Sequence, residues 1–456
     1  MDFNGHQALI SNRVLLPEIL AHIFLLFGDV SVLHDDDNRS NLASCSRVCR
    51  EWRDLALPLI WRYLDFRCRS TRPNGIERLK RLAHFLTDPR SQRVYRTVDY
   101  VSFVRRIYLR VPVACTRRCR LEATSSINNF LRQMSNHRII EEPVNEGLVG
   151  RIANLSLRPK VTKRVLDEAT SDIIIGILQL LASDQIESIE IDWPACNCCE
   201  LDGLSRLFKT LVPLMSNLRK LYYNGPWDQD VGAFLQHIPK SLKEIILISH
   251  REVSPRLDHI MFFRHLTTLE LHGIASVTVP HLQQGLSIWG ACLHRLDITA
   301  CPRLLDDLIL DAVALHCRRL KELRLYVGFT AHTPQRITEP GLCRVVDSCP
   351  HLERLRMHAI DAVGDAFLAR CARGARELRC LNIASASARL TGLGVVDVGA
   401  WGVMTELRIL YAYDRETGEY VQKEGLDLGF VRAVEIGCRA LKKYELQPDP
   451  RCFVKH

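Results

Sequence analysis

The sequence lacks an apolar run long enough to cross a membrane. Its longest near-apolar run, 173–182, is too short to span the roughly 30 Å of a bilayer's hydrocarbon core, which takes about 20 helical residues. The first residues do not combine a basic start with an apolar stretch and a small-residue cleavage site, so we expect no secretory signal. These absences predict an intracellular protein, cytoplasmic or nuclear or both, with no membrane partner.

The sequence also lacks the common motifs of catalysis. It has no Gly-rich phosphate loop, no HExxH pair and no GxSxG turn. We therefore expect no catalytic residue and no cofactor. The cysteines Cys196, Cys198 and Cys199 are not followed by a second Cys or His pair at zinc-finger spacing, so we expect no metal.

Composition places the chain among ordinary globular proteins. Its 456 residues are 47% hydrophobic and 25% charged, and this length is enough for two to four domains. There are seventeen cysteines, an odd number. Because disulfides are rare in reducing compartments, we expect most of these cysteines to be small buried hydrophobic residues.

Positive charge is concentrated in one block. Residues 61–120 hold sixteen Lys or Arg against four Asp or Glu, a net charge of +12 within a chain whose total is +9. Such a block attracts either nucleic acid or an acidic protein surface. No nucleic-acid recognition motif accompanies it, so we favour a solvated linker or an acidic partner.

A six-residue phrase, apolar-x-x-apolar-x-apolar, recurs along the chain. Its middle residues are separated by 24 to 34 positions, close to the 20–29 expected of leucine-rich repeats. These middle residues are Ile189, Leu221, Ile245, Leu269, Leu296, Leu323, Leu355, Leu381, Leu410 and Tyr444.

The phrase fits a strand better than a helix. Positions five apart lie about 140° from one another around a helix, whereas residues two apart share one face of a strand. Helix-like stretches follow the strands, as in 306–320, where Leu308, Ala312, Leu315 and Arg319 mark one stripe. One strand–helix unit cannot cover its own apolar face, so the units must stack. The predicted fold class is α/β, with a solenoid of parallel strands on the concave face and helices outside.

The phrasing resembles the cysteine-containing subclass of leucine-rich repeats. Cys317, Cys349 and Cys438 each lie three residues before the first Leu of a phrase, and the stretch 296–307 is similar to that subclass's strand, turn and helix start. The resemblance extends from about residue 186 to 446. The phrases that begin at Val104 and Ile152 are candidates for degenerate early copies.

A solenoid of this kind predicts a protein-binding surface on its concave strands and on the rim where the longer loops gather. Aromatic and Arg side chains bury much area for little loss of rotamer freedom, which suits protein recognition. Some of these residues are equally suited to packing their own loops. The candidates for binding an unknown protein substrate are Tyr222, Trp227, Arg324, Tyr326, Phe329, Arg336, His358, Tyr411 and Tyr413.

Residues 13–65 have a different pattern. A Pro at the first position of a helix and a Glu in its first turn favour a helix from Leu16, with apolar residues on one stripe. A second apolar stripe predicts a helix over 42–56, capped by Ser40 or Asn41, and Pro58 begins a third short helix. Three such helices cannot bury all of their apolar surface alone, which predicts a covering partner or domain.

This order of residues resembles an F-box, in the form common in fungal proteins. The matching segments are Leu16-Pro17-x-Ile19-Leu20, Val48-Cys49-Arg50-x-Trp52 and Pro58-Leu59-x-Trp61, although the connection at 28–41 is longer than usual. The resemblance implies binding to a Skp-type adaptor and, through it, to a cullin and a RING subunit. The residues that match the adaptor-facing pattern are Leu16, Pro17, Ile19, Leu20, Ile23, Leu42, Val48 and Trp52. Each has a second interpretation, which is to hold the helices together.

The sequence therefore predicts an F-box at 13–65, a basic linker with a degenerate first repeat at 66–150, a repeat solenoid at 151–446 and a tail at 447–456. The favoured function is a non-catalytic substrate receptor of an SCF-type cullin-RING ubiquitin ligase. One alternative is an adaptor-bound scaffold without ligase function. Another, less favoured, is a basic repeat protein that binds nucleic acid.

Overall fold

A computed structural model gives the fold of the chain. The residues that it describes are 36–67, 81–82, 101–110, 172–181, 185–192, 204–225, 229–249, 263–274, 276–327, 336–360, 362–385, 390–393, 395, 398, 401–411 and 426–446. The predicted helix from Leu16, the early copy at Ile152, the cysteines at 196–199 and the tail at 447–456 lie outside these ranges. In the described residues no helix is long and apolar enough to cross a membrane.

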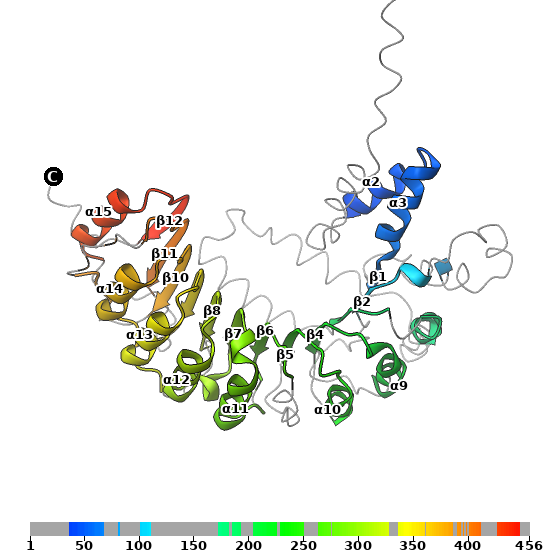
Figure 1. The fold of residues 1–456 in the computed structure, drawn as a ribbon, viewed down its shortest axis with the longest axis horizontal. Helices are drawn as coiled ribbons and strands as arrows, with labels where there is room; N and C mark the ends of the chain where they lie inside the picture. The colour runs from blue at the N-terminus through cyan, green and yellow to red at the C-terminus, as the bar shows by residue number, and fades with distance from the viewer. Residues whose placement is uncertain are drawn as a thin grey trace, which may run out of the picture.

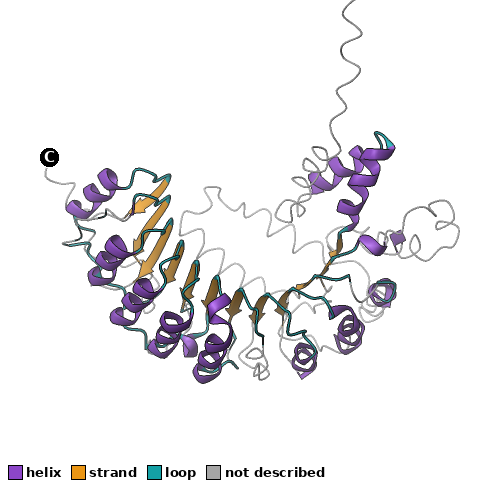
Figure 2. Cartoon of the chain, viewed as in Figure 1, coloured by secondary structure: helices purple, strands orange, loops and turns teal. Residues whose placement is uncertain are grey.

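One sheet runs through the described chain. It has 12 strands, all parallel and each paired with the next along the sequence. The strands line the inside of an arc (Figures 1 and 2). They are β1 Tyr63–Arg67, β2 Arg106–Arg110, β3 Ser188–Asp192, β4 Lys220–Gly225, β5 Glu244–Ser249, β6 Thr268–His272, β7 Arg295–Thr299, β8 Glu322–Tyr326, β9 Arg354–His358, β10 Cys380–Ser385, β11 Glu406–Tyr411 and β12 Lys443–Leu446.

Helices cover the outer side of the arc. Each lies between two consecutive strands, as the strand–helix unit of the sequence predicts (Figure 2). The bounds are α9 Leu204–Leu211, α10 Gln229–Gln236, α11 Val279–Trp289, α12 Asp307–His316, α13 Glu339–Ser348, α14 Asp365–Gly374 and α15 Leu428–Gly437, with 3₁₀ turns η1 Val101–Phe103, η2 Val212–Met215, η4 Gly290–Cys292 and η5 Pro302–Leu304.

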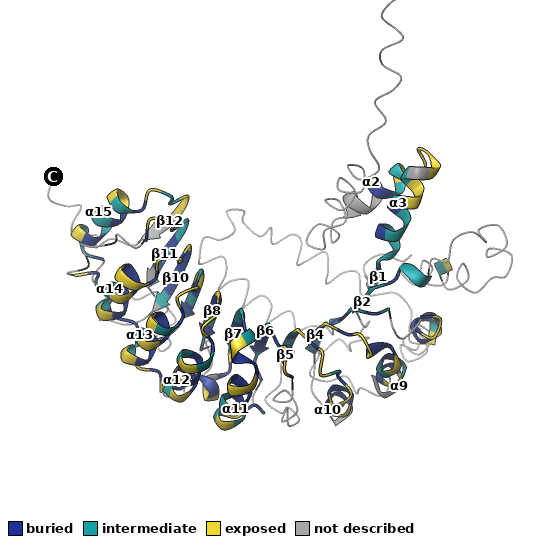
Figure 3. Cartoon of the chain, in the orientation of Figure 1, coloured by how far each residue is buried: buried dark blue, intermediate teal, exposed yellow. Residues whose placement is uncertain are grey.

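The apolar positions of the phrase form the core between sheet and helices. In β6 and β7, for example, Leu269, Leu271, Leu296 and Ile298 are at most 1% exposed. Figure 3 shows buried residues where the helices meet the sheet and exposed residues on the outer side of the helices. The predicted α/β solenoid with strands inside and helices outside is confirmed.

The cysteines of the phrase lie at helix ends. Cys317, Cys349 and Cys438 follow α12, α13 and α15 as C-cap residues, and all three are buried free thiols. The Cys349 thiol donates to the carbonyl oxygen of Cys317 at 3.5 Å. Burial raises the pKa of Cys349 to about 12 and that of Cys438 to about 11, so both stay protonated. These cysteines act as small core residues, as predicted.

The α12 stripe differs from its prediction. Leu308 and Leu315 are 52% and 66% exposed, whereas the buried face is made of Ile309, Leu310, Ala312 and Val313. The helix turns the stripe with Ile309, Leu310 and Val313 toward the core, which leaves Leu308 and Leu315 on the solvent side. Asp306 caps the helix by accepting from the Leu308 N–H at 2.9 Å.

One repeat has a different register from the predicted one. Leu407, and not Leu410, pairs with Leu381, so the phrase in this repeat is Met404-x-x-Leu407-x-Ile409. A shift of three residues along a strand moves every side chain to the other face. Tyr411 pairs with Ser385, so its position in the register differs from the concave position at which it was predicted.

The amino-terminal helices also differ from their prediction. The structure has α2 at Asp36–Cys45 and α3 at Arg50–Trp61, separated by a turn, instead of one helix over 42–56. Pro58 lies inside α3 and does not begin a third helix. The chain then enters the sheet directly, because β1 begins at Tyr63. Leu42, Ala56 and Leu59 form a small core of their own between α2 and α3.

Candidate functional site

The concave face of the sheet carries three rows of side chains. Because the strands pair in register, equivalent positions stand side by side from strand to strand. Among residues with described side chains, the central row includes Tyr108, Glu190, Tyr222, Ile246, Glu270, Asp297, Arg324, Arg356, Asn382 and Arg408. The first row, two residues earlier on each strand, includes Lys220, Glu244, Arg295, Glu322, Arg354 and Glu406. The third row, two residues later, includes Asp192, Asn224, Ile248, His272, Thr299, Tyr326 and His358.

Charge on this face changes sign along the arc. Strands β3 to β7 carry five carboxylates against Lys220, Arg295 and His272. Strands β8 to β11 carry four arginines against only two carboxylates, Glu322 and Glu406. A protein that lies along the arc therefore meets an acidic half followed by a basic half.

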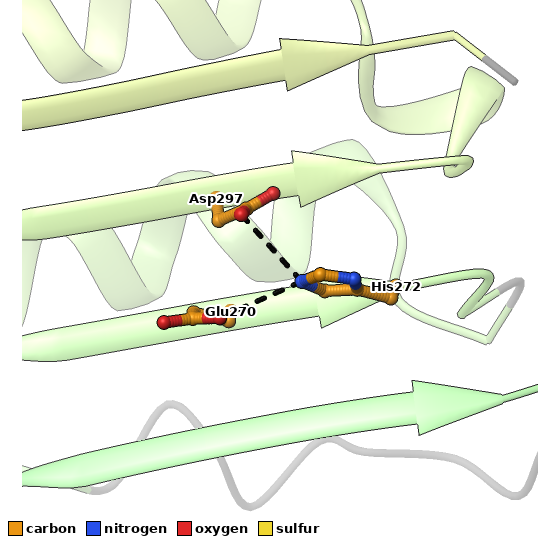
Figure 4. Close-up of side chains that lie close together, drawn as sticks. All are labelled: Glu270, His272 and Asp297. Carbon is orange, nitrogen blue, oxygen red and sulfur yellow. Dashed lines mark ion pairs between the residues drawn. The ribbon is translucent and has the colours of Figure 1, made fainter. Parts of the chain in front are cut away.

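A cluster of three residues lies on β6 and β7, at the end of the acidic half that adjoins the basic half. His272 points between Glu270 of its own strand and Asp297 of the next, with Nε2 3.6 Å from an oxygen of each (Figure 4). Burial alone would lower the pKa of His272, but the two carboxylates outweigh burial and raise it to about 9. The imidazole is therefore protonated at neutral pH and holds the carboxylates together.

Asp297 is the most deeply buried carboxylate of the cluster, with a side chain that is 1% exposed. Burial alone would raise its pKa. His272, a 2.6 Å hydrogen bond from the Thr299 hydroxyl and the charge of Arg324 outweigh that effect and hold the pKa below its ordinary value. Asp297 thus stays ionised under the cations around it.

The cluster has a donor set that can coordinate a divalent cation, since one ligand atom of each residue lies within 4.8 Å of the others. However, Arg295 Nε lies 2.9 Å from Glu270, and the guanidinium of Arg324 lies 3.6 Å from Asp297. A metal would have to displace the imidazolium proton and sit beside two guanidiniums. The charges therefore favour an ion-pair cluster.

The raised pKa predicts how stability depends on pH. The folded pKa of His272 is about 9 and the unfolded value is about 6.5, so its stabilisation is present below pH 6.5 and is lost as the pH rises through 9. We expect the difference in unfolding free energy between the natural chain and His272→Gln to shrink by about 2 kcal/mol between pH 7 and pH 10. Urea unfolding of both proteins at the two pH values measures this difference. A difference that stays constant with pH would contradict the pairing.

Apolar side chains interrupt the polar rows at β5. We call Ile246, Ile248 and the neighbouring Tyr222 the apolar step. Ile246 and Ile248 both occupy concave positions and are half-buried, whereas the corresponding positions on β6 to β9 are polar or charged. Tyr222 neighbours Ile246 in the central row. Burial, together with the charges of Asp192 and Glu190, raises the pKa of Tyr222 to about 12, which keeps the phenol neutral. This apolar step is a suitable place for an apolar side chain of a partner.

The structure brings four of the predicted substrate-binding residues onto one face. Tyr222, Arg324, Tyr326 and His358 all occupy concave positions, and the rings of Tyr326 and His358 meet edge to face at 5.9 Å. Arg336 lies apart from them, beside the start of α12, where it is 3.8 Å from Asp306. The side chain of Tyr411, together with Trp227, Phe329 and Tyr413, lies outside the described residues.

Sequence reasoning missed several residues of this face. Ile246, Ile248, Arg295, Glu322 and Arg354 all lie in the three rows. The repeat phrase already indicates these positions. Side chains alternate between the two faces of a strand, so the residues just before, between and just after the last two apolar residues of the phrase must face away from the core. Selection by aromatic and Arg character at the later positions of each phrase passes over the isoleucines and over the residues just before the middle Leu, such as Arg295 and Arg354.

Comparison with known proteins bears on the amino-terminal part. Residues 17–67 match the family model described as F-box-like. The segment is F-box-like. A search of curated proteins gives no match. Among solved structures, 42 chains match, including an internalin from Listeria monocytogenes with 11% identity and a TM-score of 0.29, over 60% of this chain and 83% of that one.

In the F-box-like segment, three of the predicted adaptor-facing residues can be placed. Leu42 is fully buried in the small core, Trp52 packs against that core and is half-buried, and Val48 is 64% exposed in the turn between α2 and α3. Leu42 therefore holds the helices together in this structure, while Val48 is available to a partner. Leu16, Pro17, Ile19, Leu20 and Ile23 lie outside the described residues.

The chain thus joins an F-box-like segment to a leucine-rich-repeat solenoid. This combination is typical of non-catalytic proteins that hold other proteins. The joint is short, because α3 ends at Trp61 and β1 begins at Tyr63. In Figure 1, α2 and α3 stand at the end of the arc next to β1, so the F-box-like helices continue into the solenoid without a long linker.

Proposed function

We propose that this protein is the substrate-recognition subunit of an SCF-type cullin-RING ubiquitin ligase. The F-box-like segment binds a Skp-type adaptor, and the concave face of the solenoid binds the protein to be modified. The observation that carries the proposal is the joining, in one chain, of residues 17–67 to an open sheet face whose polar, charged and apolar side chains are partly accessible.

The catalysis in this proposal belongs to the partner subunits. The receptor holds a target near a charged ubiquitin carrier and so converts an intermolecular encounter into an effectively intramolecular one. A rigid joint serves this purpose, because it fixes the target's position relative to the adaptor. The direct passage from α3 into β1 supports such a joint.

Direct binding to the adaptor tests the first half of the proposal. The purified chain and a purified Skp-type adaptor are mixed and separated by size-exclusion chromatography with light scattering. We expect a stable one-to-one complex. Separate elution of the two proteins at micromolar concentration would contradict the proposal. Recovery of the adaptor from cells without a cullin would favour the alternative of a scaffold without ligase function.

The second part of the proposal, in which the concave face binds the target, predicts that the apolar step contributes to target binding. Tyr222→Ala combined with Ile246→Asp removes its aromatic ring and places a charge at its centre. We expect the amount of co-purified target to fall fivefold or more, which corresponds to about 1 kcal/mol for the loss of one anchor. Quantitative mass spectrometry after affinity purification of the full chain measures the change.

The matched control for this variant is Ile436→Asp on α15, where the replaced isoleucine is 78% exposed on the outer side. The control should retain both target and adaptor. Equal target recovery from Tyr222→Ala/Ile246→Asp and the control would remove the apolar step from the binding surface.

A further inference from the structure

Four arginines are grouped on the concave face across β7, β8 and β9. This arginine cluster consists of Arg295, Arg324, Arg354 and Arg356. Glu322 lies beneath three of them, at 3.5 Å from Arg295, 3.2 Å from Arg354 and 3.9 Å from Arg356. One carboxylate therefore serves three guanidiniums.

The cluster has more positive than negative charge. Its four guanidiniums and the protonated His272 pair directly with three carboxylates, Glu270, Asp297 and Glu322. Glu353 and Glu406 act on Arg354 and Arg356 from farther away, and each pairs with a cation outside the cluster, Lys321 and Arg408 respectively. Among the groups in direct ion-pair contact, positive charges therefore outnumber negative charges by two. In addition, the Nε atom of Arg324 is buried and has no hydrogen-bond partner in the described part of the chain.

The negatively and positively charged side chains of the cluster also differ in how deeply they are buried. The carboxylate side chains of Glu322 and Asp297 are 8% and 1% exposed, whereas that of Arg354 is 53% exposed. The carboxylates contact guanidinium nitrogens from the more buried side, and the arginine side chains are the more exposed partners in each pair. An approaching partner therefore meets a preorganised cationic surface, which favours an anion.

The spacing of the cluster indicates what kind of anion fits. Arg354 and Arg356 are two residues apart on β9, about 6.6 Å, and Arg324 is on the neighbouring strand, about 4.8 Å from Arg356. Alternate side chains of an extended peptide are also about 6.6 Å apart. Two carboxylates at alternate positions match this spread better than a single phosphate group does.

The rest of the face argues against a long polyanion. A nucleic acid that covered the cluster and continued along the arc would meet Glu190, Asp192 and Glu244 on β3 to β5. Like charges at close range cost binding energy. A protein segment with a local acidic stretch avoids this repulsion.

We propose that the arginine cluster binds an extended acidic segment of the recruited protein, with Asp or Glu at alternate positions. This inference rests on the proposed function, because it assigns a chemical class to the target of the same face. Arg354 and Arg356 bind the carboxylates, Arg324 adds a third guanidinium, and Glu322 keeps the group in place.

The test uses the full chain and a fluorescein-labelled peptide with glutamate at alternate positions, followed by fluorescence anisotropy. The same peptide with glutamine is the uncharged control. We expect the glutamate peptide to bind and Arg354→Gln/Arg356→Gln to weaken it at least tenfold. The matched variant Arg318→Gln/Arg319→Gln removes the same charge from two exposed residues after α12 and should change binding less than twofold.

Several results would overturn the inference. These are equal binding by the two double variants, equal binding of the glutamine peptide, or binding only of a phosphoserine peptide or a single-stranded oligonucleotide. Because Arg354 is the most exposed member, Arg354→Gln alone, with an unchanged circular dichroism spectrum, separates lost binding from lost folding. Measuring adaptor capture by the same preparations distinguishes failure of this inference from failure of the proposed function. Capture without peptide binding refutes only this inference, whereas absence of capture by the natural chain refutes the proposed function.

Discussion

Leu16→Asp combined with Pro17→Asp is expected to abolish capture of a Skp-type adaptor while the solenoid stays folded. Both residues belong to the segment that resembles the start of an F-box, and Pro17 begins the F-box-like match. Burial of one Leu side chain contributes about 1.5–3 kcal/mol, and a buried unpaired carboxylate costs more. We therefore expect the dissociation constant to rise at least a hundredfold, as measured by isothermal titration calorimetry.

The matched control replaces Leu393, an apolar residue that is 71% exposed in the solenoid, by Asp. It should leave adaptor binding unchanged. Val48→Asp adds a second test, because Val48 is 64% exposed and its replacement should not disturb folding. Full adaptor binding by Leu16→Asp/Pro17→Asp would show that the adaptor uses some other surface.

Trp289→Ala is expected to destabilise the solenoid by about 3–5 kcal/mol, the usual cost of removing a buried Trp side chain. Trp289 ends α11 and is fully buried. Its ring is packed so closely that a Cβ added at Gly285 would lie 2.7 Å from it. Thermal and urea unfolding, followed by circular dichroism, measure the loss.

Two phenylalanine variants separate packing from hydrogen bonding. Trp289 Nε1 has no hydrogen-bond partner in the described part of the chain, whereas Trp401 Nε1 donates to the Cys371 carbonyl at 3.1 Å. Trp401→Phe should therefore cost about 1 kcal/mol more than Trp289→Phe. A loss below 1 kcal/mol for Trp289→Ala would mean that the α11 site is not a packed core.

The repeat fold could be predicted because its phrase is set by local geometry. Apolar residues at i, i+3 and i+5 fit a strand that enters from a turn, and the same spacing recurs at Leu269, Leu296 and Leu323. Prediction failed where two phrases overlap. Met404, Leu407 and Leu410 offer two registers, and only pairing with β10 selects Leu407.

The amino-terminal helices were harder to predict for a similar reason. The stripe over 42–56 is continuous in sequence, but the chain turns at 46–49 so that α2 and α3 can pack on Leu42. The apolar residues after Pro58 suit a helix or a strand equally well. Tyr63–Arg67 becomes a strand because β2, from about forty residues later, offers an edge with which to pair.

The candidate site was predictable as a surface but not as a set of interactions. The sequence places Glu270, His272 and Asp297 on one face, since their positions in the phrase are known. The raised pKa of His272 and the sharing of Glu322 by three arginines depend on register between strands that are 27 to 32 residues apart. Such cross-strand contacts cannot be read from a local pattern.

The most direct test is a parallel purification of the natural chain and two variants, each of which alters one of the two proposed binding surfaces. The natural chain, Leu16→Asp/Pro17→Asp and Tyr222→Ala/Ile246→Asp are each recovered from cells, and adaptor and target are quantified together. We predict that the first variant loses the adaptor and keeps the target, while the second keeps the adaptor and loses the target. Loss of both partners from either variant, with the solenoid still folded, would contradict two independent binding surfaces on this chain.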